Sequence, residues 1–445
     1  MAALGDELSP GALVTDPAIV EGYRSDQAPT VEPGVPLCLV RAADRADVQA
    51  TMRVASRFGV PVVPRGAGTG LSGGAAAVDG AITLSTERLR HLEIDPAAMV
   101  AVVGPGLLNV EVKEAARRHG LWYPPDPSSF ETCSIGGNLA TNAGGLCCVR
   151  YGVTGDHVLG LDVVLADGRW VQLGGRTVKD VAGYDLKRLF VGSEGTLGII
   201  TGAILRLRPP PPPVATVVGT FDGLVDAGRA VAAVMARLRP VSLELMDRAA
   251  VAAVEAVAPM GLDAVGTLLL GQAAAGSVDV EAMAAAFTDA GATYVATTED
   301  PDEGTMLMAA RRMAVPCVER LGTVMIEDVC VPISRAPDLV AQIEAIAARH
   351  RTLVPVIGHA GDGNFHPLVT FDGADPAAAA RAEVVVDEIV RAALDLGGTV
   401  TGEHGVGSLK ARHLADQLGA EVLSLTRQVK VALDPRNLLN PGKWV

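Results

Sequence analysis

The sequence is poor in aromatic residues and has no long apolar run. Aromatic side chains make up 3% of its 445 residues, whereas hydrophobic residues make up 49%. The core must therefore be built mostly from Ala, Val and Leu, and the length allows two or three domains. No stretch approaches the roughly 18 uncharged apolar residues that a membrane-spanning helix needs.

Positive charge is also scarce. The chain carries 37 Lys and Arg against 51 Asp and Glu, which gives a formal net charge of -14. Because nucleic-acid binding needs a basic surface, this composition argues against a nucleic-acid partner. An anionic small substrate would depend on a few local arginines or on a metal.

The six cysteines form no CxxC pair, which argues against an iron-sulfur cluster or a zinc ribbon. We expect the adjacent Cys147 and Cys148 to be packed thiols, because neighbouring cysteines bridge only with strain. The N-terminus shows no basic stretch followed by an apolar run, so no signal peptide is predicted. The expected location is cytoplasmic, with peripheral membrane association left open.

Glycine, in contrast, is abundant and occurs in two dense stretches. Pro64–Gly74 can bring successive backbone N–H groups close to an anion, which suits a pyrophosphate, although a flexible surface loop is the alternative. It does not supply the GxGxxG turn between a strand and a helix, nor a P-loop, so a nicotinamide-type Rossmann site is disfavoured. Ser134–Gly145 offers amide groups suited to a polar heteroaromatic ring. Together the two loops make a flavin dinucleotide plausible.

Three of the eight histidines lie in two further glycine-flanked stretches. His359 and His366 flank a Gly-Asp-Gly core, where a hairpin-like bend could bring both imidazoles to one point, as a metal requires. Glu403 and His404 could add a carboxylate and another imidazole. The alternative is that the histidines are hydrogen-bonded turn residues.

Short strands and helices alternate without a regular βαβ series, which indicates an α+β fold. Asp167-Gly168 between two apolar runs predicts a β-hairpin, and a strand is expected over Val265–Leu270. Pro209–Pro213 can form neither a helix nor a central strand, so we expect a stiff linker there. It would separate a first domain, residues 1–208, from a second, residues 214–420. Residues 421–445 are predicted to dock back on the first domain.

Four segments of the first half resemble the FAD domain of the vanillyl-alcohol-oxidase/p-cresol-methylhydroxylase (PCMH) superfamily: Arg65–Gly74, Ser134–Gly145, Lys179–Leu186 and Phe190–Ile200. Gly358–His366, Gly402–Gly405 and the closing Leu433–Lys443 resemble the FAD-linked oxidase C-terminal domain. The resemblance extends from about residue 35 to the end. It implies a two-part PCMH-type FAD-binding domain and an α+β substrate (cap) domain with an antiparallel sheet.

The resemblance also implies site residues. Some members attach the flavin to a histidine of the first loop, where this chain has Thr69, so FAD is expected to bind non-covalently. The implied cofactor-binding residues lie in the two loops and just before a later strand: Arg65, Gly66, Ala67, Gly68, Thr69, Gly70, Ser72, Ser134, Gly137, Asn138, Thr141, Asn142, Gly144, Glu194, Gly198 and Ile200.

For the second half, the resemblance implies His359, His366 and Glu403 as ligands of a divalent metal, Zn²⁺ or Mn²⁺. His404 corresponds to the catalytic base and Arg311 to the group that binds the substrate carboxylate. A guanidinium suits a planar carboxylate because it can form two parallel hydrogen bonds. Without the resemblance, Arg311 would be interpreted as a helix-surface charge.

Members of this kind include D-lactate dehydrogenases, glycolate oxidase flavoprotein subunits and D-2-hydroxyglutarate dehydrogenases. The implied reaction oxidises a D-2-hydroxy acid to the 2-oxo acid, with hydride passing to flavin N5 and a metal assisting deprotonation of the hydroxyl. The hydroxyglutarate enzymes have Trp, Lys and Asn near the apolar Met308, Ile326 and Leu368. A second substrate carboxylate would then be buried unpaired, which is costly, so D-lactate is favoured.

The implied partners are the small 2-hydroxy acid and an electron acceptor, either a protein or a quinone. Assembly is left open between a homodimer and a multi-subunit oxidase complex. An alternative from another class is a flavin-binding partner subunit with no turnover of its own.

Overall fold

The computed structural model describes residues 1–261 and 266–444, which divide into two compact units. The first unit gathers Met1–Gly144, Gly152–Pro210 and Glu403–Val445, and the second contains Gly145–Tyr151 and Pro211–Gly402. The chain leaves the first unit within the polyproline run and returns to it at Glu403, earlier than the expected residue 421. The strand predicted from Val265 begins outside the described residues.

The first sheet of the first unit carries the first glycine-rich loop at its edge. Its strand order is β1-β2-β4-β3, and β4 pairs in parallel with both β2 and β3. Helix α3 (Arg45–Phe58) links β2 to β3; Asp44 caps its start and Gly59, with φ of 70°, ends it. The strands are β1 (Leu13–Val14), β2 (Cys38–Arg41), β3 (Val62–Arg65) and β4 (Ile82–Ser85).

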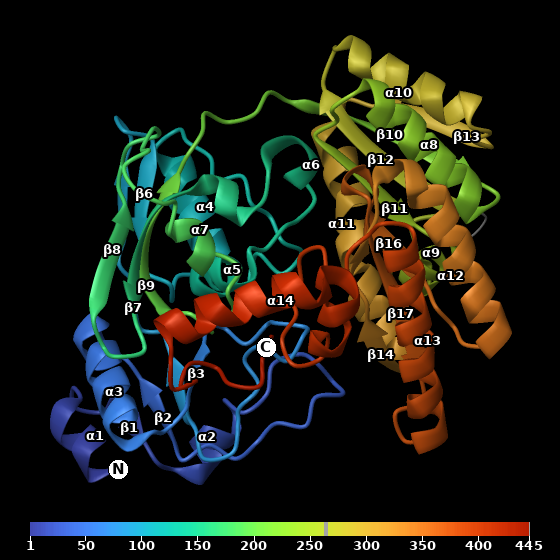
Figure 1. Cartoon of the computed structure of the whole chain (residues 1–445). Helices are drawn as coiled ribbons and strands as arrows, with labels where there is room; N and C mark the ends of the chain where they lie inside the picture. Colours follow the sequence, from blue (N-terminus) through green and yellow to red (C-terminus); the bar gives the residue numbers. More distant parts are fainter. Residues whose placement is uncertain (262–265, 445) are drawn as a thin grey trace. The chain divides into compact units, whose positions relative to one another are not determined.

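The second sheet of this unit is antiparallel, in the order β5-β6-β9-β7-β8. The hairpin predicted at Asp167-Gly168 is confirmed by the pairing of β7 with β8. The strands are β5 (Leu92–Asp95), β6 (Val100–Val103), β7 (Val158–Val164), β8 (Trp170–Gly174) and β9 (Ile199–Arg206), and the main helices are α4 (Asn109–Arg118), α5 (Ile135–Thr141) and α14 (Leu414–Leu433) (Figure 1).

The second unit is built on one antiparallel sheet of order β13-β10-β12-β11-β16-β17-β14, with β15 also paired to β17. The strands are β10 (Val214–Phe221), β11 (Ser242–Met246), β12 (Thr267–Ala274), β13 (Tyr294–Thr298), β14 (Thr323–Ile326), β15 (Val329–Cys330), β16 (Val356–His359) and β17 (Asn364–Phe371). Its long helices are α8 (Leu224–Arg237), α9 (Arg248–Glu255), α10 (Val278–Asp289), α11 (Pro301–Val318), α12 (Ala336–His350) and α13 (Pro376–Asp395).

The helices of this unit pack in two groups. Helix α12 packs against α8 and α13, whereas α9 packs against α11. Residues of α9 and α11 join side chains of β12, β16 and β17 in one hydrophobic cluster, so these two helices cover the sheet beside the histidine-bearing strands. The expected α+β class with an antiparallel second sheet is confirmed.

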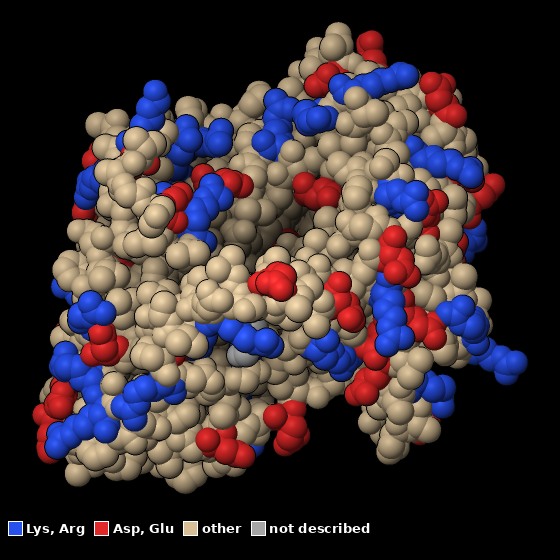
Figure 2. All heavy atoms as spheres, viewed as in Figure 1, with Lys and Arg blue, Asp and Glu red and all other residues tan. Residues whose placement is uncertain are grey.

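Charged side chains of both signs lie on the surface of the protein (Figure 2). Acidic and basic side chains are interspersed over the face drawn in Figure 2. Among the described residues, no helix is both long enough and apolar enough to cross a membrane.

Candidate active site

The first glycine-rich loop begins where β3 ends at Arg65. Gly68 has φ of 77°, which a residue with a side chain adopts only under strain, and a Cβ there would collide with the Arg65 guanidinium. Within the described part of the chain, the backbone amides of Gly68, Thr69 and Gly70 donate no hydrogen bond. A run of unused amides on a glycine-rich turn is a suitable cradle for a pyrophosphate.

The Arg65 side chain contacts an earlier segment of the chain. Its Nη1 donates to the carbonyl of Ser25 at 2.6 Å, and its guanidinium lies 5.7 Å from the centre of the Tyr23 ring. Burial lowers the pKa of Arg65. The Arg65 guanidinium thus contacts Ser25 and Tyr23, whereas its role toward the cofactor stays a prediction.

The second glycine-rich stretch is not the continuous loop that we expected. Residues Ile135–Thr141 form α5, because Ser134 caps the helix start by accepting from Gly137 N at 3.2 Å. The same Ser134 hydroxyl accepts from Ala67 N at 3.2 Å. One side chain therefore joins the start of α5 to the first loop.

Three amide and hydroxyl side chains of this stretch have partners within the protein. Asn138 accepts from Asn109 Nδ2 at 3.0 Å, and Thr141 donates to the carbonyl of Gly137 at 3.1 Å. Asn142, with φ of 54°, ends the helix, and its Oδ1 accepts from Gly155 N at 2.8 Å. These contacts hold α5 in place.

Glu194 fastens the C-terminal segment of the first unit. Its buried carboxylate accepts from Val406 N at 2.7 Å, Gly407 N at 2.8 Å and Trp444 Nε1 at 2.8 Å. Its carbonyl accepts from Asn440 Nδ2 at 2.7 Å. Burial raises the pKa of Glu194, while these donors oppose the shift.

The other two residues expected near this strand are packed. A Cβ on Gly198 would lie 2.5 Å from Val163 Cγ1 and 2.9 Å from the Phe190 ring, and Ile200 belongs to the hydrophobic core. Gly198 is therefore needed for close packing of β9.

The two histidines of the second unit meet across a hairpin. His359 ends β16, and His366 lies in β17 opposite Ile357. The bend between them includes Gly363, with φ of 73°. The two rings are buried, their centres are 5.2 Å apart at 84°, and nitrogen atoms of the two rings lie within 4.8 Å of each other. The bend predicted from the sequence is confirmed.

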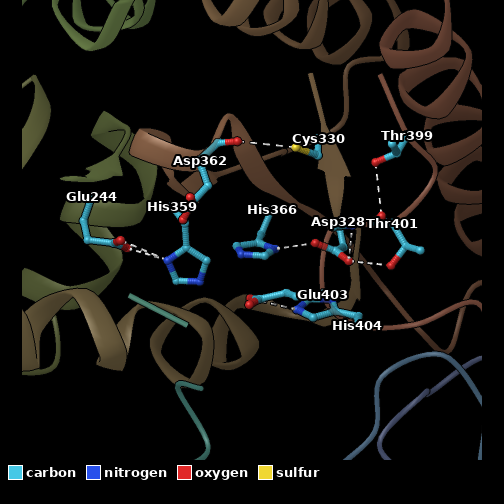
Figure 3. A network of polar contacts seen from close by, with 11 residues as sticks. Glu244, Asp328, Cys330, His359, Asp362, His366, Thr399, Thr401, Glu403 and His404 are labelled. Atoms are coloured by element: carbon cyan, nitrogen blue, oxygen red, sulfur yellow. Dashed lines mark hydrogen bonds and ion pairs between the residues drawn. The ribbon is translucent and has the colours of Figure 1, made fainter. Parts of the chain in front are cut away.

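Each of these imidazoles faces a buried carboxylate that sequence reasoning missed (Figure 3). His359 Nδ1 lies 2.9 and 3.0 Å from the two carboxylate oxygens of Glu244 on β11. His366 Nδ1 lies 3.6 Å from Asp328 Oδ1. The only signal for Glu244 was a charged residue in the otherwise apolar stretch Leu243–Met246.

Arg311 is not a surface charge. Its side chain on α11 is 3% exposed, and its Nε lies 3.0 Å from Oε2 of Glu244. A single carboxylate therefore contacts both the guanidinium expected to bind substrate and the imidazole expected to bind metal. Because the pair is buried, neither partner could be removed without leaving an uncompensated charge.

Asp328 also holds the end of the second unit. Its Oδ2 accepts from Thr401 Oγ1 at 2.6 Å and from Gly402 N at 2.9 Å. A Cβ on Gly402 would lie 2.5 Å from the Asn364 side chain, so this approach needs glycine. The peptide that leads into Glu403 is therefore fixed beside the carboxylate that faces His366.

Glu403 and His404 rest on the glycine-rich loops of the first unit. A Cβ on Gly144 would collide with the Glu403 carboxylate, and Ser72 Oγ donates to the carbonyl of His404 at 3.2 Å. Glu403 Oε1 and His404 Nε2 are 3.9 Å apart. Gly144 and Ser72 thus contact the expected ligand and base of the reaction.

The apolar trio lies near the histidine-bearing strands, in the cluster formed with α9 and α11. Met308 and Leu368 are buried in this cluster, and Ile326 pairs with Leu368 across β14 and β17. Leu368 is on the same face of β17 as His366, two residues away. These three side chains therefore provide an apolar environment.

The matches to known families define the class. Residues 36–174 match the FAD binding domain family, and residues 210–444 match the family described as FAD linked oxidases, C-terminal domain. The protein is therefore an FAD-dependent oxidoreductase, as the resemblance implied. Within that class, the chain belongs to the FAD-linked oxidase family.

Curated relatives match over nearly the whole chain. Glycolate oxidase subunit GlcD of Bacillus subtilis (strain 168) is 39% identical over 429 residues, covering 95% of this chain and 91% of the relative. D-lactate dehydrogenase of Archaeoglobus fulgidus is 36% identical over 448 residues, covering 99% of this chain and 98% of the relative.

Solved structures share the fold. p-Cresol methylhydroxylase with substrate bound gives a TM-score of 0.83 at 18% identity, covering 100% of this chain and 95% of that one. 4-Ethylphenol oxidase from Gulosibacter chungangensis gives 0.82 at 20% identity, with coverage of 100% and 96%. The expected PCMH-type architecture is confirmed.

Proposed function

We propose that this protein oxidises a short D-2-hydroxy acid to the 2-oxo acid, with D-lactate as the favoured substrate. The observation that carries the proposal is the attachment of Glu403 and His404. Gly144 and Ser72 of the flavin-binding loops contact these two residues, and Glu403 is bonded directly to Gly402, which Asp328 holds. The candidate ligand and base are thus tied to the cofactor loops and to the histidine-bearing unit.

The chain's own groups suit FAD bound without a covalent link. The unused amides of Gly68, Thr69 and Gly70 would receive the pyrophosphate. Thr69 has no ring nitrogen to bond the flavin. Bound FAD would supply the hydride acceptor, and the protein would orient the substrate carbon toward it.

The donors also suit a divalent metal. We infer that His359, His366 and Glu403 would hold it, because Asp328 both faces His366 and fixes Gly402, the residue before Glu403. Imidazole and carboxylate ligands fit both Zn²⁺ and Mn²⁺. Such a metal would polarise the substrate hydroxyl as a Lewis acid. His404 would accept the hydroxyl proton, a role that needs an imidazole within hydrogen-bond reach.

Arg311 would bind the substrate carboxylate. Its Nε is occupied by Glu244, so the substrate would use the terminal nitrogens of the guanidinium. Glu244 would keep this arginine in one orientation. The apolar Met308, Ile326 and Leu368 favour a substrate with a short hydrocarbon side chain over one with a second carboxylate.

A second candidate substrate is glycolate. Relatives named glycolate oxidase subunit GlcD are 39% and 38% identical to this chain, and glycolate is also a 2-hydroxy monocarboxylate. Their description as subunits supports assembly with other proteins that accept the electrons. Under this alternative, turnover by the isolated chain would depend on an artificial acceptor.

Anaerobic bleaching of the flavin absorbance tests the proposal. Purified protein should bleach with D-lactate, more slowly with glycolate, and not with L-lactate. Steady-state assays with an artificial acceptor should rank D-lactate above D-2-hydroxyglutarate. A flavin that none of these acids bleaches would instead support a partner subunit without turnover. A clear preference for D-2-hydroxyglutarate would show that another residue receives the second carboxylate.

A further inference from the structure

The two imidazoles share an arrangement that the proposed reaction does not require by itself. In each case the Nδ1 atom faces a carboxylate: Glu244 for His359 and Asp328 for His366. Both carboxylates are almost completely buried, with relative exposures of 1% and 0%. The two acids come from different strands and loops, so the similarity does not follow from local sequence.

Burying a carboxylate costs free energy unless hydrogen-bond donors compensate it. Glu244 is compensated by Arg311 at 3.0 Å in addition to His359. Asp328 Oδ2 accepts from Thr401 and Gly402, and its Oδ1 lies 3.6 Å from His366 Nδ1, a charge contact longer than a hydrogen bond. A carboxylate accepts hydrogen bonds and cannot donate them, so it favours the imidazole form that carries its hydrogen on Nδ1.

An imidazole with hydrogen on Nδ1 presents the lone pair of Nε2. Carboxylate partners of this kind fix the tautomer and orientation of metal-binding histidines. We propose that Glu244 and Asp328 are positioning residues that fix His359 and His366 as Nε2 ligands of a divalent metal. The inference rests on the proposed metal site and extends it to two residues outside the ligand set.

Asp328 has a second positioning role. The same carboxylate that faces His366 holds Gly402, and the next residue is Glu403. One buried acid therefore orients one ligand and fixes the backbone that delivers another. Glu244 has the corresponding double role, because it orients His359 and holds Arg311.

Asp328→Asn should change the tautomer of His366 while keeping the acceptor that holds Thr401 and Gly402. The amide oxygen can take the place of Oδ2 and still accept from Thr401 and Gly402. The amide NH₂ then faces His366 Nδ1 and favours hydrogen on Nε2, which blocks metal binding by that atom. Glu244→Gln makes the equivalent change beside His359, with the added loss of the counter-charge of Arg311.

The first measurement uses metal-free protein labelled with ¹⁵N-histidine, and two-bond nitrogen–proton correlations identify each tautomer. With eight histidines in the chain, single His→Gln variants can assign the two signals. We expect both His359 and His366 to carry hydrogen on Nδ1, and His366 to switch in Asp328→Asn. Hydrogen on Nε2 of either ring in the unsubstituted protein overturns the proposal.

The second measurement is the affinity for Zn²⁺ or Mn²⁺, by competition with a chelator and without turnover. Asp328→Asn and Glu244→Gln should each weaken binding about 10- to 100-fold. The matched control is Asp247→Asn, a buried carboxylate of the same unit that caps α9 and faces backbone amides; its affinity should be unchanged.

The outcomes are distinguishable. If the unsubstituted protein binds neither metal, the proposed metal site fails, and this inference fails with it. If it binds metal and Asp328→Asn binds within twofold of it, only the inference is overturned. A fall in the melting temperature of the metal-free protein with unchanged affinity indicates a purely structural role and also overturns it. If Glu244→Gln fails to fold, the metal affinity of Asp328→Asn and the tautomers of the unsubstituted protein still test the proposal.

Discussion

The indole Nε1 of Trp444 donates a hydrogen bond of 2.8 Å to the carboxylate of Glu194, 250 residues earlier in the chain. Glu194 also accepts from the amides of Val406 and Gly407, so it joins both ends of the returning segment to the flavin-binding unit. The residue that resemblance assigned to the cofactor is thus a clamp between distant parts of one unit.

This clamp predicts a measurable coupling. Trp444→Phe removes one donor and should lower the free energy of unfolding by about 1 kcal/mol, whereas Glu194→Ala leaves three buried donors unsatisfied and should cost roughly 2–4 kcal/mol. In the Glu194→Ala background, Trp444→Phe should cost little more. Denaturant unfolding of the four proteins in this cycle would measure it. If the losses in unfolding free energy from the two substitutions added fully, the proposed interaction between Glu194 and Trp444 would be contradicted.

The cofactor should be released by denaturation. Because Thr69 cannot form a covalent bond to the flavin, acid or heat precipitation should leave FAD in the supernatant, where its absorbance and fluorescence identify it. Yellow colour that remains with the precipitated protein would show a covalent link and contradict the prediction.

Activity should depend on metal. Chelation should abolish turnover, and Zn²⁺ or Mn²⁺ should restore it, because either ion would accept imidazole and carboxylate ligands and polarise the substrate hydroxyl. His359→Ala should lose both bound metal and turnover while keeping FAD. A suitable control is His350→Ala, which changes a partly buried histidine of the same unit that pairs with Glu388 on neighbouring α13. If His359→Ala retained metal content and activity, the ligand assignment would be wrong.

Arg311→Lys tests the carboxylate-binding role. Lysine keeps the charge but cannot contact Glu244 and a substrate carboxylate with one planar fork. We expect kcat/KM for D-lactate to fall about 30- to 1000-fold, which corresponds to roughly 2–4 kcal/mol. The exposed Arg335→Lys, whose partner is Asp338, serves as the control. Unchanged kinetics for Arg311→Lys would remove Arg311 from the site.

We expect ionisation of the buried Asp247 carboxyl to make the stability of the fold depend on pH. Burial raises the pKa of this carboxyl from 3.8 to about 6. Because the folded pKa exceeds the unfolded one, the ionised group destabilises the fold; the penalty grows as pH rises from about 4 to 6 and is complete above that range. Asp247→Asn keeps an oxygen to cap Ala250 and should gain stability at pH 8, by up to about 3 kcal/mol, with the gain shrinking toward pH 4.

Melting temperatures at several pH values would measure this difference. The exposed Asp338→Asn provides the control, since a solvated carboxylate should give no comparable trend. A gain that stayed constant from pH 8 down to pH 4 would indicate that the effect is unrelated to ionisation of Asp247.

The features that sequence predicted are those with local causes. Asp167-Gly168 forms a hairpin because the turn chemistry is contained in two residues, and the Gly-Asp-Gly core brings His359 and His366 together for the same reason. Helix α5 was missed because its glycines are poor helix formers; the cap from Ser134 compensates for them.

The features that sequence did not predict depend on partners far along the chain. Glu244 lies 115 residues before His359, and Glu194 lies 212 residues before Val406. No periodicity connects such pairs, because sheet order and the return of the chain bring them together. A single acidic residue in an apolar strand indicated that Glu244 has a partner, but not which one.

The first unit is completed by three separate segments, of which the last begins at Glu403. During synthesis on a ribosome, Glu194 emerges long before the amides of Val406 and Gly407 and the indole that it will bind. During synthesis, the Glu194 carboxylate therefore lacks these hydrogen-bond donors until the second unit and the segment from Glu403 have been translated. Premature termination within the second unit would yield a fragment that lacks Glu403, His404 and the residues that Glu194 binds.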